Sequence, residues 1–402
     1  MTPGPPGVVF FGRAQSCAIA ARWQSGHAAA CKAVYAGSIP TLASTQTSPT
    51  IPLRTKPPKP APIRTVVAYP GTEVVDGART AGIAARVGPD RAGAILRGSQ
   101  VAMAFEALGD RWSSLVMREV FLGARRFEEF VAATNASRAT LTLRLRALVD
   151  QGILYRHPYQ ARPARYEYRL TRIGMDLYPT ALMYWLWERH YGGGSGLPQE
   201  LVHRTCGHSM LPLLVCRTCH EPLTIGDIRV EVVAEPDETQ VSLPKYCLHS
   251  GRDSWRGKDH RTVHVIDVIG DRWTALVQAA TYYGLHRFAD IQTALAVPTN
   301  TLADRLRLLV QAGVLLRTPY QDHPPRYAYR LSEKGRELYL PAFTLHQWAN
   351  RWLLRGRVAP IRLSHRPCGD VVTGVVVCDH CREELRPAEV DAQRPERRAR
   401  PV

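Results

Sequence analysis

The chain has 402 residues, of which 45% are hydrophobic, enough for two or three domains with buried cores. It contains no run of 18 apolar residues, and the short apolar patch at residues 8–11 does not resemble a signal peptide, so we expect no membrane span and a cytoplasmic, nucleoid-associated protein. The formal net charge is +17, which is compatible with a nucleic-acid partner, although such a charge also serves simple solubility.

The N-terminal segment, residues 1–95, differs from the rest of the chain. It is rich in proline, it shows no helical or strand period, and its residues 56–62 read K-P-P-K-P-A-P, which is typical of a polyproline-like linker. We expect this segment to be disordered, or to be an extension that arises from a start codon placed too far upstream. We also expect a disordered tail at residues 391–402.

The remainder contains one unit twice. Residues 99–191 align without a gap with residues 260–352, at a constant offset of 161, and 34 of the 93 aligned residues are identical. The shared motifs are G-D-R-W, L-x-x-R-L-R, P-Y-Q and R-Y-x-Y-R-L, which begin at residues 109, 141, 158 and 165 of the first copy. A duplication of this size predicts two domains of one fold, which we place at residues 96–192 and 257–355.

Each copy predicts the same elements in the same order. Apolar residues at helical spacing indicate helices, and alternation of Tyr and Leu with charged residues indicates a half-buried strand. The predicted helices are 99–108, 112–121, 127–133 and 138–150 in the first copy, and 260–269, 273–282, 288–295 and 299–311 in the second. Two strands joined by a proline-rich tip follow, and then a long helix at 172–191 or 333–354.

Helices followed by a two-stranded hairpin are typical of the winged helix-turn-helix, in which the helix before the hairpin reads DNA and the hairpin is the wing. The fold class we predict is therefore mainly α with small β wings: two tandem winged helix-turn-helix domains plus two small zinc-binding β elements.

On these residues the chain resembles the HxlR family of bacterial winged-helix regulators. The second copy carries the fullest match, with D-V-I-G-D-R-W-T-x-L from residue 267 and P-P-R-Y-x-Y-x-L-S-x-K-G from residue 324. The resemblance implies a sequence-specific transcriptional regulator, in the simplest case a repressor, whose two protomers are here fused in one chain. The family commonly has a sensor cysteine 13 residues before the Trp. Ser99 and His260 occupy those positions, so we expect no thiol sensing there.

The predicted recognition helices supply the first candidates for DNA contact. We place Arg144 and Arg305 on the solvent face, where an Arg can contact guanine or a phosphate, the alternative being an ion pair with a nearby acid. We expect Arg146 and Arg307 to be structural and Asp304 to weaken binding by the second copy. Further candidates in the first turns are Arg138, Thr140, Thr142, Thr299, Asn300 and Thr301.

The predicted wings supply three more candidates. Arg162, Arg165 and Arg326 could contact phosphates or the minor groove, and Arg165 and Arg326 could equally stack on neighbouring Tyr rings.

Each copy is followed by a His-x-x-Cys and a Cys-x-x-Cys motif. Three thiolates and one imidazole favour zinc in a closed tetrahedral site. We predict one structural zinc within each of the elements 199–232 and 361–390; a reversible disulfide in each Cys-x-x-Cys is the alternative, and haem attachment is disfavoured because Arg382 replaces the His220 of the first copy. The predicted ligands are His203, Cys206, Cys216 and Cys219 for the first zinc, and His365, Cys368, Cys378 and Cys381 for the second.

We find no catalytic motif and predict a non-enzymatic protein that binds double-stranded DNA. The two winged helices should pair inside one chain as a pseudo-dimer, with the long terminal helices between them. Two other functions stay open at this point. One copy could be a degenerate sensing or pairing domain, which the changes Pro298 and Asp304 would assign to the second copy. Alternatively, the protein could be a zinc-dependent interaction scaffold without a specific DNA target.

Overall fold

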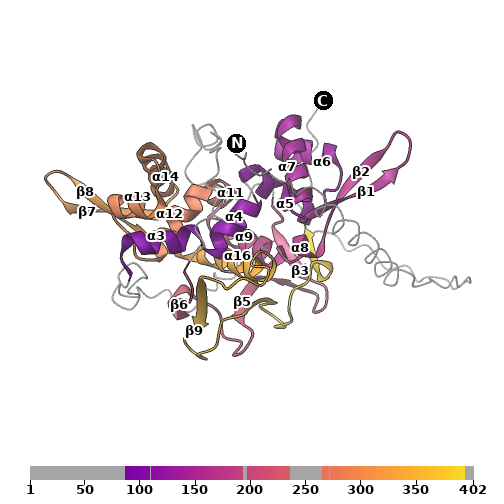
Figure 1. The fold of residues 1–402 in the computed structure, drawn as a ribbon. Helices are drawn as coiled ribbons and strands as arrows, with labels where there is room; N and C mark the ends of the chain where they lie inside the picture. Colours follow the sequence, from indigo (N-terminus) through magenta and orange to yellow (C-terminus); the bar gives the residue numbers. More distant parts are fainter. Residues whose placement is uncertain (1–86, 109, 193–196, 236–264, 271, 394–402) are drawn as a thin grey trace, which may run out of the picture. The chain divides into compact units, whose positions relative to one another are not determined.

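A computed structural model describes residues 87–108, 110–192, 197–235, 265–270 and 272–393 of the chain. Most of the N-terminal segment and the tail after residue 393 lie outside the described residues. Residues 391–393, which we expected to belong to the disordered tail, form part of a strand because they pair with residues 200–202. The described part is mainly helical, with small antiparallel sheets, and its two β hairpins, at residues 154–170 and 315–331, are the wings (Figure 1). None of its helices is long and apolar enough to cross a membrane.

The described residues of the first copy form six helices and one hairpin. They are α4 (Gln100–Leu108), α5 (Arg111–Phe121), α6 (Phe127–Thr134), α7 (Arg138–Asp150), β1 (Leu154–Gln160), β2 (Arg165–Leu170), α8 (Arg172–Met175) and α9 (Tyr178–Tyr191). The second copy repeats this order with α11 (Val265–Ile269), α12 (Arg272–Tyr282), α13 (Phe288–Leu295), α14 (Thr299–Gln311), β7 (Leu315–Gln321), β8 (Arg326–Leu331), α15 (Glu333–Glu337) and α16 (Tyr339–Trp352). The winged helix-turn-helix prediction is therefore confirmed for both copies.

Local side chains explain where the helices begin. The carboxylate of Asp110 accepts hydrogen bonds from the backbone N–H groups of Trp112 (3.0 Å) and Ser113 (3.2 Å) and so caps α5. The Ser137 hydroxyl caps α7 by accepting from the N–H of Thr140 (3.1 Å). Pro298 stands at the equivalent N-cap of α14, which has no side-chain cap. The two recognition helices thus have the same length but differently stabilised N-termini.

The two wings have the same register. Leu154 lies opposite Leu170 in the first wing, and Leu315 lies opposite Leu331 in the second, with a register shift before the tip of each. The N–H of Tyr168 donates to the carbonyl of Arg125 (2.8 Å), which ties the wing to the turn before α6. Each wing is therefore fixed to the body of its own copy.

The long terminal helix predicted in each copy is two helices. In the first copy α8 ends at Met175, and α9 begins at Tyr178, with Pro179 in its first turn. Proline is well tolerated in a first turn but not inside a helix, because its ring removes a backbone donor and clashes with the preceding turn. The second copy has the same break between α15 and α16.

Regular structure begins earlier than the sequence predicts. The helix α3 (Pro89–Arg97) starts inside the segment that we expected to be disordered. Its Ala92, Ile95 and Leu96 are fully buried in the core of the second copy. Gly93 contacts α13 so closely that a Cβ atom would lie 2.1 Å from the carbonyl oxygen of Ala294. The boundary at residue 95 is therefore wrong, because α3 packs against the distant second copy.

The two copies contact each other through α9 and α16. The hydroxyl of Thr180 donates to that of Thr344 (2.9 Å). The indole N–H of Trp187 donates to the carbonyl of Lys334 (3.0 Å), and that of Trp348 donates to the carbonyl of Ile173 (2.9 Å). Trp187 and Trp348 are equivalent positions of the two copies, and so are Ile173 and Lys334. The second bond is therefore the first with the copies exchanged. A reciprocal contact of this kind is what an isologous interface between two subunits has.

The strands after each copy also pair between the copies. They are β3 (Glu200–His203), β4 (His208–Met210), β5 (Pro212–Cys216) and β6 (Ile228–Val232) after the first copy, and β9 (Ile361–His365), β10 (Gly374–Cys378) and β11 (Val390–Gln393) after the second. The pairs are β5 with β10, β6 with β9, and β3 with both β4 and β11. Except for β3–β4, every pair therefore joins the two halves of the chain.

Candidate nucleic-acid interface and metal centres

The buried face of the recognition helix α7 consists of Leu141, Leu145 and Leu148, as the sequence predicts. Its exposed face runs through Arg138, Thr142 and Arg146, which are spaced four residues apart and so lie in one row along the helix. The most exposed row of this helix is therefore not the one through Arg144.

Arg144 is partly buried and ion-paired in the first copy. Its guanidinium forms an ion pair with Asp110, and the two side chains are only 25% and 23% exposed. Asp110 also caps α5, so this pair holds the recognition helix against the start of α5. Arg305 is the equivalent residue of the second copy and is likewise half-buried. The ion pair with an acid that we named as the alternative for Arg144 is thus present.

Arg146 and Arg307, which we expected to be structural, are both exposed on the recognition helices. The side chain of Arg146 is 81% exposed, and its Nε lies 3.8 Å from Asp150. The side chain of Arg307 is 65% exposed, and its guanidinium lies 3.3 Å from Asp304. Exposed pairs of this kind contribute little to stability, so both guanidiniums can exchange their partner for a phosphate or a base.

The candidates in the first turns of α7 have local partners. The Arg138 guanidinium binds Glu128 (2.8 Å) and lies 5.1 Å from the centre of the Phe127 ring. The hydrogen bond from Arg138 lowers the pKa of the Glu128 carboxyl. The Thr142 hydroxyl donates to the carbonyl of Arg138 (2.9 Å), and the Thr140 hydroxyl is within 2.8 Å of that of Ser137. Arg138 and Thr142 are exposed, whereas Thr140 is half-buried.

The first turns of α14 carry less positive charge. Thr299 and Asn300 are exposed, Thr301 is half-buried, and the hydroxyl of Thr299 accepts a hydrogen bond from Gln292 (2.7 Å). Thr299 stands where the first copy has Arg138. The two recognition helices therefore present different chemical groups to a partner.

The wing candidates Arg162, Arg165 and Arg326 are all exposed. The arginines that stack on Tyr rings, however, include Arg156 and Arg317, which were not among the candidates. The guanidinium of Arg156 lies 4.0 Å from the centre of the Tyr166 ring, and that of Arg317 lies 3.4 Å from the centre of the Tyr327 ring. These are equivalent positions of the two copies.

A second pair of stacked arginines lies where each wing meets the turn before the third helix. Arg126 stacks on Tyr159 at 4.7 Å, and Arg287 stacks on Tyr320 at 5.0 Å. The identity of both Arg–Tyr pairs in the two copies was the sequence signal that could have found them. Stacking holds each guanidinium in one orientation, which favours binding of an anion.

The eight predicted metal ligands form two clusters, each with its ligand atoms within 4.8 Å of one another. In the first cluster, which we call site 1, Nδ1 of His203 lies 3.5 Å from Sγ of Cys206 and 3.2 Å from Sγ of Cys381. The Sγ atoms of Cys206 and Cys378 are 3.9 Å apart. Both His203 and Cys378 are fully buried.

Site 2 has the same arrangement with the copies exchanged. Nδ1 of His365 lies 3.3 Å from Sγ of Cys219 and 3.4 Å from Sγ of Cys368. The Sγ atoms of Cys216 and Cys368 are 3.9 Å apart. A tetrahedral zinc ion with three thiolates and one imidazole would place its ligand atoms about 3.5–3.8 Å apart, so the geometry of both sites fits such an ion.

The grouping of the ligands differs from the prediction. We expected each metal to be held within one copy, but each site takes its His-x-x-Cys from one copy and its Cys-x-x-Cys from the other. The reason is the pairing of β5 with β10, which places Cys216 opposite Gly374 and Cys378 opposite Pro212. The ends of both strands thereby lie beside the ligands of the other copy.

The protonation of the thiols within site 1 is uneven. The backbone N–H of His208 donates to the Cys206 sulfur and is the main reason that its pKa is lowered to about 6. Burial raises the pKa of the Cys378 thiol to about 11. Because a thiolate is the form that binds metal, a cation entering site 1 has to displace the proton of Cys378.

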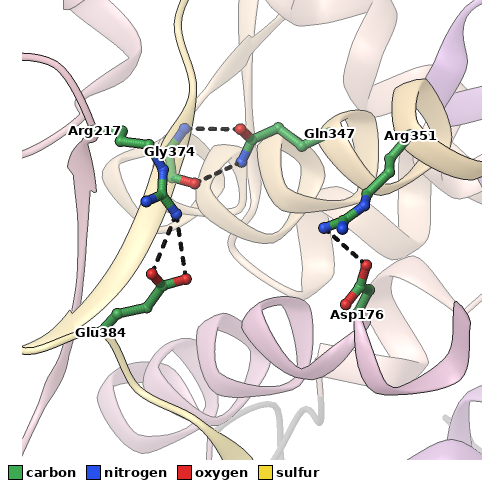
Figure 2. A network of polar contacts seen from close by, with 6 residues as sticks. All are labelled: Asp176, Arg217, Gln347, Arg351, Gly374 and Glu384. Carbon is green, nitrogen blue, oxygen red and sulfur yellow. Dashed lines mark hydrogen bonds and ion pairs between the residues drawn. The ribbon is translucent and has the colours of Figure 1, made fainter. Parts of the chain in front are cut away.

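The strand β10, which carries the site 1 ligand Cys378, is anchored to the helix α16 (Figure 2). The Gln347 side chain accepts from the N–H of Gly374 (2.7 Å) and donates to its carbonyl (3.2 Å). A Cβ atom on Gly374 would lie 2.5 Å from the Phe343 ring, so only glycine allows this contact. Arg217 binds Glu384 of the other element at 3.2 Å. The metal sites are thus connected to the helices that join the copies.

The same figure shows a contact between the copies themselves. The Arg351 guanidinium of α16 lies 3.0 Å from the carboxylate of Asp176, which follows α8 (Figure 2). Asp176 also accepts from the indole N–H of Trp352 (2.9 Å). At the equivalent positions with the copies exchanged, His190 lies 3.5 Å from Glu337.

Comparison with known proteins identifies the repeated domain. The profile of the family described as HxlR-like helix-turn-helix matches residues 107–194 and 268–357. An uncharacterized HTH-type transcriptional regulator of Mycobacterium bovis is 38% identical over 120 residues, which make up 30% of this chain and 76% of that protein. Another, from Methanothermobacter thermautotrophicus, is 31% identical over 114 residues, or 28% of this chain and 87% of that protein.

Among solved structures, a proposed transcription factor from Pseudomonas aeruginosa is 36% identical over 30% of this chain and 82% of its own, with a TM-score of 0.23. The two ranges that the family profile matches lie on the two winged helix-turn-helix copies described above. The chain therefore belongs to the HxlR-like helix-turn-helix family and carries the family's domain twice.

Proposed function

We propose that this protein is a sequence-specific, non-enzymatic DNA-binding transcriptional regulator whose two winged helices act as a built-in pseudo-dimer on one operator. The family supports the general function, since its relatives are named as HTH-type transcriptional regulators. The observation that carries the pseudo-dimer is the reciprocal pair of bonds from Trp187 to Lys334 and from Trp348 to Ile173.

In this proposal each recognition helix enters the major groove with its exposed row. For the first copy that row is Arg138, Thr142 and Arg146; for the second copy it begins with Thr299 and Asn300. Arg146 and its equivalent in the second copy would bind phosphate or guanine. The stacked arginines of the wings would bind phosphates beside the groove. Because the rows differ, the two half-sites of the operator should differ in sequence.

We further propose that both metal sites hold structural zinc. Three thiolates and one imidazole suit zinc better than harder cations such as calcium or magnesium, and the four ligands leave no open position for catalysis. His203 and His365 would bind through Nδ1, the atom that faces the sulfurs. Zinc held in this way would fix the two copies to each other, since each ion takes ligands from both.

Selection of binding sites from random duplex DNA, followed by footprinting of the purified protein at stated salt, tests the proposed function. One chain should protect two unequal half-sites whose centres lie about 10 base pairs, or one helical turn, apart. The matched variants Arg146→Ala and Arg307→Ala should each relax the sequence preference in one half-site. Binding without sequence preference, or protection of a single half-site by the intact chain, would contradict the proposal.

A further inference from the structure

A cavity of about 170 Å³ lies where α4, α5 and α9 of the first copy meet the strands β3 and β11, and its wall also includes residues of α11 and α16 of the second copy. Most of its wall is apolar and includes Phe105, Met117, Phe121, Leu182 and Trp185. Neither the contacts of the exposed recognition row nor the eight metal ligands involve these side chains. The cavity is therefore separate from both sites described above.

We propose that this cavity is a binding site for a compact apolar molecule with one hydroxyl group, of the size of a phenol. The volume supports the size, because an apolar cavity of about 150 Å³ is known to stay dry and to admit benzene. Sites for drug-sized ligands are larger, at roughly 300–1,000 Å³. A single substituted ring is thus the largest rigid group that the cavity accommodates.

A few polar groups in the wall favour a hydroxyl on the ligand. The Glu188 carboxylate is 1% exposed and accepts a hydrogen bond from the N–H of Val265 (2.7 Å). Burial raises the pKa of Tyr178, so that its phenol stays neutral and can donate or accept. The Ser114 hydroxyl also lines the cavity. A few polar groups in an otherwise apolar wall are what orient a small ligand in a binding site.

The equivalent positions of the second copy carry different side chains. Phe343 replaces Leu182, and its ring lies 5.7 Å from that of Tyr339, which in turn lies 6.3 Å from that of Tyr282. The Tyr282 hydroxyl donates to the carbonyl of Gly335 (2.6 Å). These rings pack on one another in the second copy. The side chains that the first copy contributes to the cavity wall therefore differ at several positions from their equivalents in the second copy.

The second copy also supplies the test variant. Leu182→Phe introduces the side chain that the repeat has at the equivalent position, so it should fill the cavity without changing the backbone. Ala181→Leu, on the same wall, is a second filling variant. Val358→Phe adds a ring at a position that is 72% exposed and is not among the residues of the cavity wall, and it serves as the control.

The experiment is fluorine NMR of 4-fluorophenol with the full-length protein, with thermal unfolding to show that each variant is folded. We expect saturable broadening of the 4-fluorophenol signal that unlabelled phenol reverses. Val358→Phe should keep this broadening, and whichever filling variant is folded should lose it. Absence of broadening with the unaltered protein, or equal broadening with a folded filling variant, would overturn the proposal.

Discussion

Nδ1 of His203 lies 3.2 Å from Sγ of Cys381, although 178 residues separate them in the chain. The two residues follow different copies of the winged helix, and the same exchange occurs at site 2 between Cys219 and His365. Each metal site is therefore a property of the whole chain. Because each copy is followed by a complete set of four ligands in the sequence, the sequence alone does not show this dependence.

Paired substitutions distinguish exchanged sites from sites within one copy. Cys206→Ser with Cys381→Ser removes two ligands from site 1 and none from site 2, so this variant should retain one metal ion per chain. Cys206→Ser with Cys219→Ser removes one ligand from each site, and it should retain less than one tightly bound ion. Elemental analysis of freshly reduced protein after dialysis measures both, with about two zinc ions per unaltered chain.

The reverse pattern would show that the sites are not exchanged. If the Cys206 and Cys219 variant kept one ion while the Cys206 and Cys381 variant kept fewer, each metal would be held by a single copy. A finding of no transition metal in the unaltered reduced protein would contradict the proposal of zinc altogether.

Arg144→Ala and Arg146→Ala should have opposite main effects. Loss of Arg144 leaves the Asp110 carboxylate half-buried without its ion pair, so we expect a decrease of about 1–3 kcal/mol in the free energy of unfolding. Loss of the exposed Arg146 should change stability by about 0.5 kcal/mol or less but weaken operator binding about tenfold. Urea unfolding and titration of operator DNA separate the two effects.

Arg305→Ala and Arg307→Ala are the matched variants in the second copy. Because α14 lacks the side-chain cap and the first-turn arginine of α7, Arg307→Ala should weaken DNA binding less than Arg146→Ala does. Equal losses from both would refute this difference between the copies. A large loss of DNA affinity in an Arg144→Ala protein of unchanged stability would show that Arg144 contacts DNA.

The stacked arginine of each wing should contribute to affinity without contributing to sequence preference. Arg156→Ala should lower binding to all sequences and reduce the slope of the logarithm of affinity against the logarithm of salt by about one. Tyr166→Leu is the control, since it keeps the charge and removes only the ring that orients it. An unchanged salt slope in Arg156→Ala would place this wing away from the phosphates.

His346 should make the protein less stable in mild acid. It is fully buried, and the burial lowers its pKa from 6.5 to about 4. Between pH 6.5 and about 4 the His346 imidazole is protonated in the unfolded chain but stays neutral in the folded protein. The free energy of unfolding therefore decreases as pH falls through this range, and it levels off below about pH 4. The full effect is about 3 kcal/mol.

Urea unfolding at several pH values checks this effect of His346. His346→Leu should lose less stability between pH 6.5 and 4 than the unaltered protein. His346→Leu leaves every other titratable group in place, so the difference between the two slopes isolates His346. Parallel slopes would contradict the expected burial of a neutral imidazole.

Much of the fold follows from local patterns in the sequence. The range of α7 agrees with the prediction, because its leucines are spaced for a helix and Ser137 is a good N-cap. The wings follow from the alternation around Tyr166 and Tyr168. The break between α8 and α9 was missed, although Pro179 indicated it.

The orientation of Arg144 was predicted wrongly from information that was present. Arg144 lies three residues after Leu141, which rotates it about 300° at 100° per residue and so leaves it beside the buried face. Arg146 follows Leu141 by five residues and so lies about 140° away, close to the exposed side. A residue on the border of a buried face can be an ion-pair partner of the neighbouring helix, and here that partner is Asp110.

The exchange of metal ligands depended on contacts between distant segments, which local patterns do not specify. One signal was available. The strands β5 and β10 read P-L-L-V-C and G-V-V-V-C, which are apolar on both faces. A strand that is buried on both faces has to pack against other elements on each side, and an element of about 30 residues supplies too few of them. The packing of α3 against the second copy also depends on contacts between distant segments, so it could not be predicted from the sequence of α3 itself.

The order in which the ribosome makes the chain gives the exchanged ligands one more consequence. When His203, Cys206, Cys216 and Cys219 have been synthesised, they have no complete partner set, and the first ion can be enclosed only after Cys368 has followed His365. The other ion has to wait for Cys381, 21 residues before the end of the sequence. In the proposed metal-bound state, metal can therefore join the two halves only after both copies of the domain have been synthesised, and a chain truncated before residue 365 could not complete either centre.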